Sequence, residues 1–218
     1  MDKINSTGQS LSAAESAYRK LREFIVVGQL RPGDVVNEQD LAAQLGFGRT
    51  PVREAVQRLA WQKVVTIFPR RGIAVAKLGF DDIQGIFEAR EAIESKIAEL
   101  AATRRTLQDV ESLERLGDAV SQSAESGEYF TFLGDDQALH RGIARAARNA
   151  YLADTADHLL MLSTWVWHQH FGLHGPQRKN HFHHRKIIEA IIERDPAAAR
   201  MAMSEHIQQS RELIRSAV

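Results

Sequence analysis

The order of hydrophobic and polar positions divides this chain of 218 residues into two parts. The first part, residues 12–76, mixes three helical patterns with two short β-rich runs. The second part, residues 81–218, is helical to its end and shows no β-rich alternation. We therefore predict a mainly α protein with two domains, joined by a linker at residues 77–80 and preceded by a flexible polar tail at residues 1–11.

Residues 38–76 contain the clearest local signals of the first part. A short helix around Leu41 ends at Gly46, a residue that readily adopts the left-handed conformation found after helices. A second helix begins at Thr50 and Pro51, and its apolar positions recur at the three-and-four spacing of an amphipathic helix. A helix, a tight turn and a second helix in this order are typical of a helix-turn-helix.

A further helix and a hairpin complete the first domain. Upstream, residues 14–27 have a helical pattern whose apolar stripe includes Phe24. Downstream, β-rich runs at residues 64–68 and 73–75 flank a turn of proline, two arginines and glycine. Three helices followed by a hairpin predict a winged helix-turn-helix.

Arginines lie where such a domain meets DNA. Arg49 and Arg53 are four residues apart, so both project from one side of the second helix near its N-terminus. Arg70 and Arg71 lie beside Gly72 at the tip of the hairpin, where a glycine lets the backbone approach DNA closely. A planar guanidinium can bind guanine through two hydrogen bonds or contact phosphates. Each arginine alone could belong to a solvated face, but the combination favours DNA binding.

The charge distribution agrees with a nucleic-acid partner for the first domain. The whole chain has 28 basic and 28 acidic side chains. Residues 1–76 hold 11 of the basic and 7 of the acidic ones, so the positive charge lies with the winged helix. The chain has no cysteine, no signal-peptide pattern and no apolar run approaching the roughly 20 residues that span a bilayer. We expect a cytoplasmic protein without a membrane partner.

The second part is predicted to be an all-α antiparallel helical bundle. The breaks between its helical patterns coincide with residues that favour caps or turns, such as Gly127, the segment 172–176 and the Asp195 and Pro196 pair. The six predicted helices cover residues 81–103, 107–125, 128–147, 151–171, 182–194 and 196–217.

Histidines and one aspartate carry the candidate chemistry of the bundle. Asp136 and His140 are four residues apart and share one face of a helix, as two ligands of one cation would. His184 lies 11 residues before Asp195, and His206 lies 11 residues after it. If the chain folds back at Asp195, each ring lies about 16 Å from the turn, so the two can face each other. This set suits Zn, Ni, Fe or Mn, although histidines that cap helices or border the core would give the same pattern.

Arg90, on the first helix of the bundle, is a candidate for binding a small organic acid. An inward guanidinium can hold a carboxylate through two hydrogen bonds. A surface ion pair with Glu94, four residues further on, is the alternative and is equally compatible with the sequence.

The first domain resembles a known family. The sequence LGFGRTPVREAVQRLAWQKVV, followed by RRGIAV, is similar to the DNA-binding domain of GntR-type bacterial transcription regulators over residues 12–76. Its TPVREA core is a specific signal. The resemblance implies that Arg49, Thr50 and Arg53 enter the major groove and that Gly72 lies at the tip of the wing.

Two positions depart from the pattern of that family. Gln39 stands where some members have an arginine that contacts DNA, and Gly48 replaces a serine or threonine that is often found there. Both positions remain among the candidates for DNA contact.

The bundle resembles the FCD effector domain of the FadR subgroup of GntR regulators over residues 81–215. The resemblance is carried by FEAR at residues 87–90, DQALH at 136–140 and the segment 184–206, and six helices make it more similar to the VanR-type branch. Many FCD domains hold a divalent metal through one aspartate and three histidines. The resemblance assigns these roles to Asp136, His140, His184 and His206.

These features predict a ligand-responsive transcription regulator that binds a palindromic operator in double-stranded DNA as a homodimer. The resemblance implies a small carboxylate effector at or beside the metal, and repression that the effector relieves. One alternative is a regulator in which the ion itself is the effector. Another is a metal-dependent hydrolase or lyase, because a site of His and Asp can activate water. Against an enzyme, the sequence shows no separate general-base or nucleophile motif, and a hydrolase or lyase would have no use for a winged helix.

Overall fold

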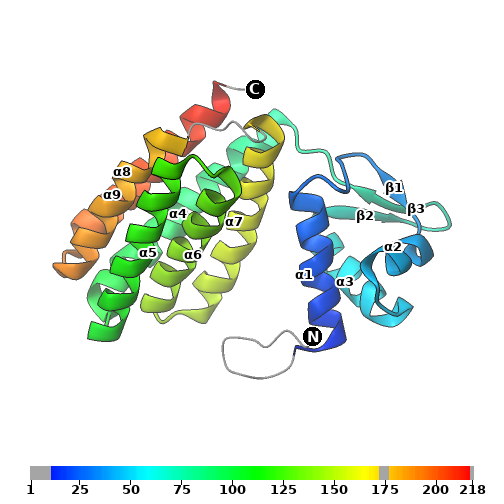
Figure 1. The fold of residues 1–218 in the computed structure, drawn as a ribbon, viewed down its shortest axis with the longest axis horizontal. Coiled ribbons are helices and arrows are strands. Elements are labelled where there is room, and N and C mark those ends of the chain that lie inside the picture. Colours follow the sequence, from blue (N-terminus) through cyan, green and yellow to red (C-terminus); the bar gives the residue numbers. More distant parts are fainter. Residues whose placement is uncertain (1–10, 172–176, 217–218) are drawn as a thin grey trace. The chain divides into compact units, whose positions relative to one another are not determined.

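The structure is a computed structural model that describes residues 11–171 and 177–216, with side chains described for 11–171 and 184–216. The chain divides into two compact units, Met1–Leu78 and Gly79–Val218 (Figure 1). No helix in the described ranges has the length and apolar character needed to cross a bilayer.

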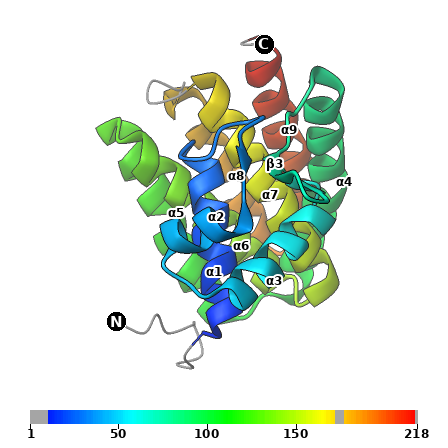
Figure 2. The same cartoon turned by 90° about the vertical axis from the view of Figure 1, so that its right-hand side faces the viewer.

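The first unit is a winged helix-turn-helix, which confirms the predicted fold (Figure 2). Its helices are α1 (Ala13–Val26), α2 (Glu38–Leu45) and α3 (Arg49–Trp61), and its strands are β1 (Val35–Val36), β2 (Val65–Phe68) and β3 (Gly72–Val75). The helix α1 packs against α3, and α2 packs against both. The strands form one antiparallel sheet in the order β1-β3-β2. Apolar residues of the helices and the sheet form the buried core of this unit.

The sheet contains a strand that the sequence pattern did not predict. The strand β1 pairs with β3, with Val36 opposite Ile73. Two residues are too few for an alternating pattern to be detected, and their pairing depends on a chain segment distant in sequence. The hairpin also differs in detail, because Gly72 belongs to β3 opposite Phe68 and the turn covers residues 69–71.

Gly46 and Gly72 both have positive φ angles but differ in their surroundings. Gly46 ends α2 with a φ of 72°, and a Cβ there would meet no atom within 4 Å. Gly72 has a φ of 110°, and a Cβ there would lie 2.7 Å from the carbonyl oxygen of Val36. The sheet therefore requires this glycine because β1 approaches it closely.

We expect Gly72→Ala to destabilise the protein more than Gly46→Ala. The Gly46 substitution costs about 1 kcal/mol, because only the backbone conformation is unfavourable. The Gly72 substitution costs about 2–3 kcal/mol, because a steric clash adds to the backbone term. Urea unfolding of both variants measures the difference, and equal losses would contradict the clash.

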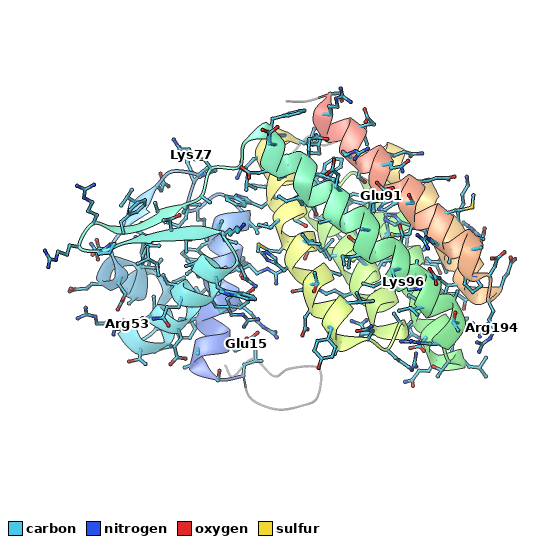
Figure 3. The ribbon with its side chains drawn as sticks, turned by 180° about the vertical axis from the view of Figure 1, so that it is seen from behind. Glu15, Arg53, Lys77, Glu91, Lys96 and Arg194 are labelled. Atoms are coloured by element: carbon cyan, nitrogen blue, oxygen red, sulfur yellow. The ribbon has the colours of Figure 1, made fainter. Side chains whose placement is uncertain are left out.

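The second unit is an antiparallel bundle, as predicted, with six helices among its described residues (Figure 1). They are α4 (Phe80–Arg104), α5 (Leu107–Ser126), α6 (Tyr129–Ala146), α7 (Ala150–Phe171), α8 (Gln177–Ile192) and α9 (Pro196–Arg215). The helix α4 packs against α9, α7 and α6, and α8 packs against α9 and α5. Where α4 meets α9, the Glu91 carboxylate accepts hydrogen bonds from Ser204 and Gln208, each 2.7 Å long (Figure 3).

Two boundaries in the bundle differ from the prediction. The helix α4 begins at Phe80, inside the predicted linker, and the Asp82 carboxylate accepts the backbone N–H of Gly79 at 2.9 Å. The helix α8 begins at Gln177 instead of residue 182, because the polar start of this helix has no apolar periodicity to reveal it. The predicted break at 172–176 lies outside the described residues.

Arginine side chains connect the C-terminal ends of α4 and α8. Arg105 donates hydrogen bonds to the carbonyl oxygens of Ile191 and Ile192. In return, Arg194 donates to the carbonyl oxygens of Thr103 and Arg105, each at 3.1 Å (Figure 3). These bonds satisfy carbonyls that a helix leaves free at its end, where positive charge is also favourable. They fix the ends of the two helices relative to each other.

Candidate functional sites

The first candidate site is the exposed N-terminal end of α3. This helix begins at Arg49, one residue earlier than predicted, after Gly48 as its N-cap. Its apolar face is buried in the unit, whereas Arg49, Thr50 and Arg53 are exposed. Figure 3 labels Arg53 on this helix. The predicted contact residues of this helix therefore lie where a DNA duplex could reach them.

The other predicted DNA contacts lie on α2 and on the wing. Gln39 is exposed in the first turn of α2. Arg70 and Arg71 are exposed in the turn between β2 and β3, and Arg70 has a left-handed φ of 64°. Gly72 is half-buried. The wing therefore presents its two arginines to solvent.

Glu38, which the sequence argument missed, contacts both arginines of α3. It is the first residue of α2 and accepts hydrogen bonds from Arg53 Nε at 3.1 Å and Arg53 Nη2 at 2.8 Å. Its Oε1 atom also lies 3.9 Å from Arg49 Nε. The hydrogen bonds with Arg53 lower the pKa of Glu38. Fifteen residues separate Glu38 from Arg53, so no local pattern reveals the pair.

The second candidate site is a cluster of four side chains inside the bundle. Asp136 and His140 come from α6, His184 from α8 and His206 from α9, and one ligand atom of each lies within 4.8 Å of the others. His184 Nε2 lies 3.0 Å from Asp136 Oδ1, and the ring centroids of His184 and His206 are 4.3 Å apart. All three rings are buried, with at most 5% of each residue exposed. The structure thus brings together the four residues that the sequence pattern selected.

The turn between α8 and α9 brings two of these four side chains together. The Asp195 side chain accepts the backbone N–H of Ala198 at 2.9 Å, and Pro196 occupies the first turn of α9. The helices α8 and α9 then pack against each other. Because His184 and His206 lie equally far from the turn, their rings meet.

The donor set of this cluster fits a divalent transition metal. Burial raises the pKa of Asp136, but His140 and then His184 outweigh burial and lower the pKa to about 2, so this side chain is a carboxylate. His140 Nε2 is buried, lies 3.8 Å from Asp136 Oδ1 and has no hydrogen-bond partner among the described residues. An unsatisfied buried ring nitrogen is unfavourable, and a metal ion would use its lone pair. Imidazole nitrogen and carboxylate oxygen are ligands that such ions accept.

Arg90 forms the predicted pair with Glu94, but the pair is buried instead of exposed. Each residue is 3% exposed, and Arg90 Nε donates to Glu94 Oε1 at 2.6 Å. Arg90 Nη1 donates to Ser163 Oγ at 3.0 Å, whereas Nη2 is buried without a hydrogen-bond partner among the described residues. The other Glu94 oxygen contacts His140 Nδ1. Burial raises the pKa of Glu94, but Arg90 and then His140 outweigh burial and lower the pKa to about 2.

A winged helix-turn-helix in one unit and a helical bundle in the other define a transcription regulator. Residues 13–75 match the family of bacterial regulatory proteins named gntR, and residues 85–209 match the FCD domain. The chain therefore belongs to the GntR family of regulators that carry a C-terminal FCD domain.

Known proteins agree with this assignment. The chain is 30% identical over 197 residues to an HTH-type transcriptional regulator in an unstable DNA locus of Streptomyces ambofaciens. The aligned region covers 88% of this chain and 80% of that protein. It is 28% identical over 201 residues to the HTH-type transcriptional repressor RspR of Escherichia coli, with 92% and 88% covered. The solved structure of E. coli McbR/YncC has the same fold, with a TM-score of 0.84 at 22% identity over 94% of this chain and 98% of that one.

The two relatives named above are transcription regulators and not enzymes. The protein is therefore a regulator, and the metal-dependent hydrolase or lyase considered from the sequence is set aside.

Proposed function

We propose that this protein is a repressor that binds a palindromic operator as a homodimer and releases it when a small carboxylate metabolite binds at or near a metal ion. One observation carries the proposal: the same chain has exposed arginines on a recognition helix and a buried set of one aspartate and three histidines. Because its target is bacterial chromosomal DNA, the protein acts in the cytoplasm.

The DNA-binding half of the proposal rests on α3 and the wing. Arg49, Thr50 and Arg53 are placed to contact base edges and phosphates in the major groove. Arg70 and Arg71 are placed to contact phosphates or the adjacent minor groove. One recognition helix covers one half-site, so a palindromic operator needs two copies of the chain.

The sensing half of the proposal rests on the bundle. Asp136, His140, His184 and His206 would hold a divalent ion, of which Zn, Ni, Fe and Mn are candidates. When bound, such an ion supplies positive charge and open positions for the oxygen atoms of an effector. Arg90 uses Nε and Nη1 in its hydrogen bonds to Glu94 and Ser163, so Nη2 is the donor that could bind the carboxylate of an effector.

Release of DNA requires the effector to bind one conformation of the dimer more tightly than the other. The four ligands lie on α6, α8 and α9, so a ligand at this cluster contacts three helices at once. A change in their packing would alter the spacing of the two recognition helices and weaken operator binding. The coupling is reciprocal, so operator DNA should weaken effector binding by the same factor.

Operator binding measured with and without ligands tests the proposal. A duplex selected by the protein from a random DNA pool serves as operator, and the dissociation constant is measured with Zn²⁺, with Ni²⁺ and with a panel of small organic acids. We expect an acid to weaken binding about tenfold or more in the metal-loaded protein, within the usual range of allosteric coupling. An affinity that no ion or acid changes would contradict a ligand-responsive regulator.

A second candidate function is a regulator in which the ion is the effector, and a small cavity that touches His140 supports it. The cavity lined in part by Glu94, His140 and Met203 has a volume of about 10 Å³, which is room for one water molecule. This cavity does not hold an organic acid without rearrangement of its walls. In the same titration, release of the operator by Zn²⁺ or Ni²⁺ alone would establish this function in place of the first.

Glu38→Gln is expected to reduce discrimination between operator and random DNA. The substitution removes a negative charge near the phosphates and frees both arginines of α3, so affinity for random duplex rises about three- to tenfold. Operator affinity rises less, because Arg53 loses the carboxylate that orients it. Glu23→Gln, at an exposed position of α1, removes the same charge and serves as the control. Equal gains for both duplexes would show that Glu38 acts only through its charge.

A further inference from the structure

A buried series of hydrogen bonds runs from α7 through α4 to the histidine cluster. Arg90 donates to Ser163 Oγ at 3.0 Å and to Glu94 Oε1 at 2.6 Å, and Glu94 Oε2 contacts His140 Nδ1. Arg90, Glu94 and His140 are each at most 5% exposed. Charges are unfavourable in a protein core unless they are paired and hydrogen-bonded, and here each carboxylate oxygen has a partner.

Glu94 determines which nitrogen of His140 is available to a ligand. A carboxylate that is paired with a guanidinium is ionised and only accepts hydrogen bonds, so His140 Nδ1 carries the hydrogen. A metal ion binds the neutral imidazole, which has one protonated nitrogen, so with the hydrogen on Nδ1 the Nε2 atom presents its lone pair. Nε2 is the atom that lies 3.8 Å from Asp136 Oδ1. The lone pair is therefore on the nitrogen beside Asp136, another member of the cluster.

We propose that Glu94 is a positioning residue of the metal site, which holds His140 in the tautomer that can bind the ion, while Arg90 holds Glu94 in place. The inference rests on the proposed metal site. Histidines that bind metals usually donate their other N–H group to a carboxylate, a carbonyl or water. The contact between Glu94 and His140 has this arrangement, and Arg90 adds a further layer behind it.

Zinc affinity of the full-length Glu94→Gln variant tests the role of the carboxylate. A glutamine can donate to Nδ1 as well as accept from it, so His140 is no longer restricted to one tautomer. We expect Zn²⁺ to bind about 10- to 100-fold more weakly, measured by competition with a chromophoric chelator. Glu99→Gln, on the same helix but paired with Lys96 and Arg200 at the surface, is the matched control and should leave affinity unchanged. Wild-type zinc affinity in Glu94→Gln would overturn the inference.

The tautomer of His140 separates positioning from a merely structural role. Long-range proton–nitrogen NMR spectra of the metal-free protein with ¹⁵N-labelled histidine report which ring nitrogen is protonated. In the wild-type protein we expect Nδ1–H, and in Glu94→Gln a substantial population of Nε2–H. A carboxylate that only helps the helices to pack would leave the tautomer unchanged, and that result would overturn the inference.

A second variant covers the case in which Glu94→Gln does not fold because Arg90 is left buried without its partner. The double variant Arg90→Met and Glu94→Gln removes both charges and replaces each with an uncharged side chain closer in size, a change that proteins often tolerate. It should fold and show the same weakening of zinc binding, and wild-type affinity would again overturn the inference. If the wild-type protein itself binds no Zn²⁺, the proposed metal site is wrong. If the wild-type protein binds Zn²⁺ and only the Glu94 variants bind it more weakly, both the metal site and the role of Glu94 are supported.

Discussion

We expect Arg53→Ala to lower operator affinity by about 5- to 150-fold, the range that corresponds to loss of an arginine that contacts a base. Arg53 is the exposed arginine four residues into α3, with 57% of its side chain accessible. Without Arg53, Glu38 also loses the partner that neutralises it and would repel the phosphates nearby. Both effects act in the same direction, so this substitution should have the largest effect on DNA binding.

Fluorescence anisotropy with a selected duplex at constant salt measures this loss. Arg19→Ala, on α1, removes the same charge and an exposed ion pair with Glu15, so it should change affinity little. Circular dichroism and size-exclusion chromatography should show the same fold and oligomeric state for both variants. Unchanged affinity in Arg53→Ala would remove α3 from its proposed role as recognition helix.

The double substitution His184→Ala and His206→Ala should reduce bound metal from about one ion per chain to trace levels, because two of the four proposed donors are lost. The wild-type protein should also gain stability from the ion, about 2.7 kcal/mol at a free metal concentration 100 times the dissociation constant. That gain should be absent from the double variant. These two residues lie on adjacent helices, so their loss removes the contact between α8 and α9 through the ion.

Elemental analysis and thermal unfolding with and without Zn²⁺ measure both effects. His168→Ala is the matched control, because His168 lies on α7 against the rings of Tyr129 and Phe130 and is not one of the four clustered ligands. Its metal content should equal that of the wild-type protein. Stoichiometric metal in the double variant would refute the ligand set, and loss of metal in the control would show that the assay responds to general destabilisation.

Several features of the fold follow from short stretches of sequence. The end of α2 at Gly46 and the start of α9 at Asp195 and Pro196 depend on the conformations that these residues favour locally. The meeting of His184 and His206 follows from the same turn, because two helices that fold back at one residue match positions equally distant from it. Helical periodicity also predicts the buried faces, since residues three and four apart share one side.

Other features depend on segments that are distant in the chain. The two-residue strand β1 exists because it pairs with β3, and that contact excludes a side chain at Gly72. Glu38 and Arg53 are 15 residues apart, and Glu94 and His140 are 46 apart. No period of a helix or strand relates such positions, because their meeting depends on how whole elements pack.

The burial of the pair between Arg90 and Glu94 could not be predicted from the sequence. Its spacing from Glu94 predicts the ion pair, since both lie on one face of α4. The same spacing is compatible with an ion pair at the surface or with one in the core. The pair is buried because the helices α6 and α7 pack against α4. Local preferences of the chain thus determined the helices, the turns and the meeting of His184 with His206. The approach of Asp136 and His140 to these two rings, and the contacts of Glu94 and Glu38, emerged from packing between distant segments.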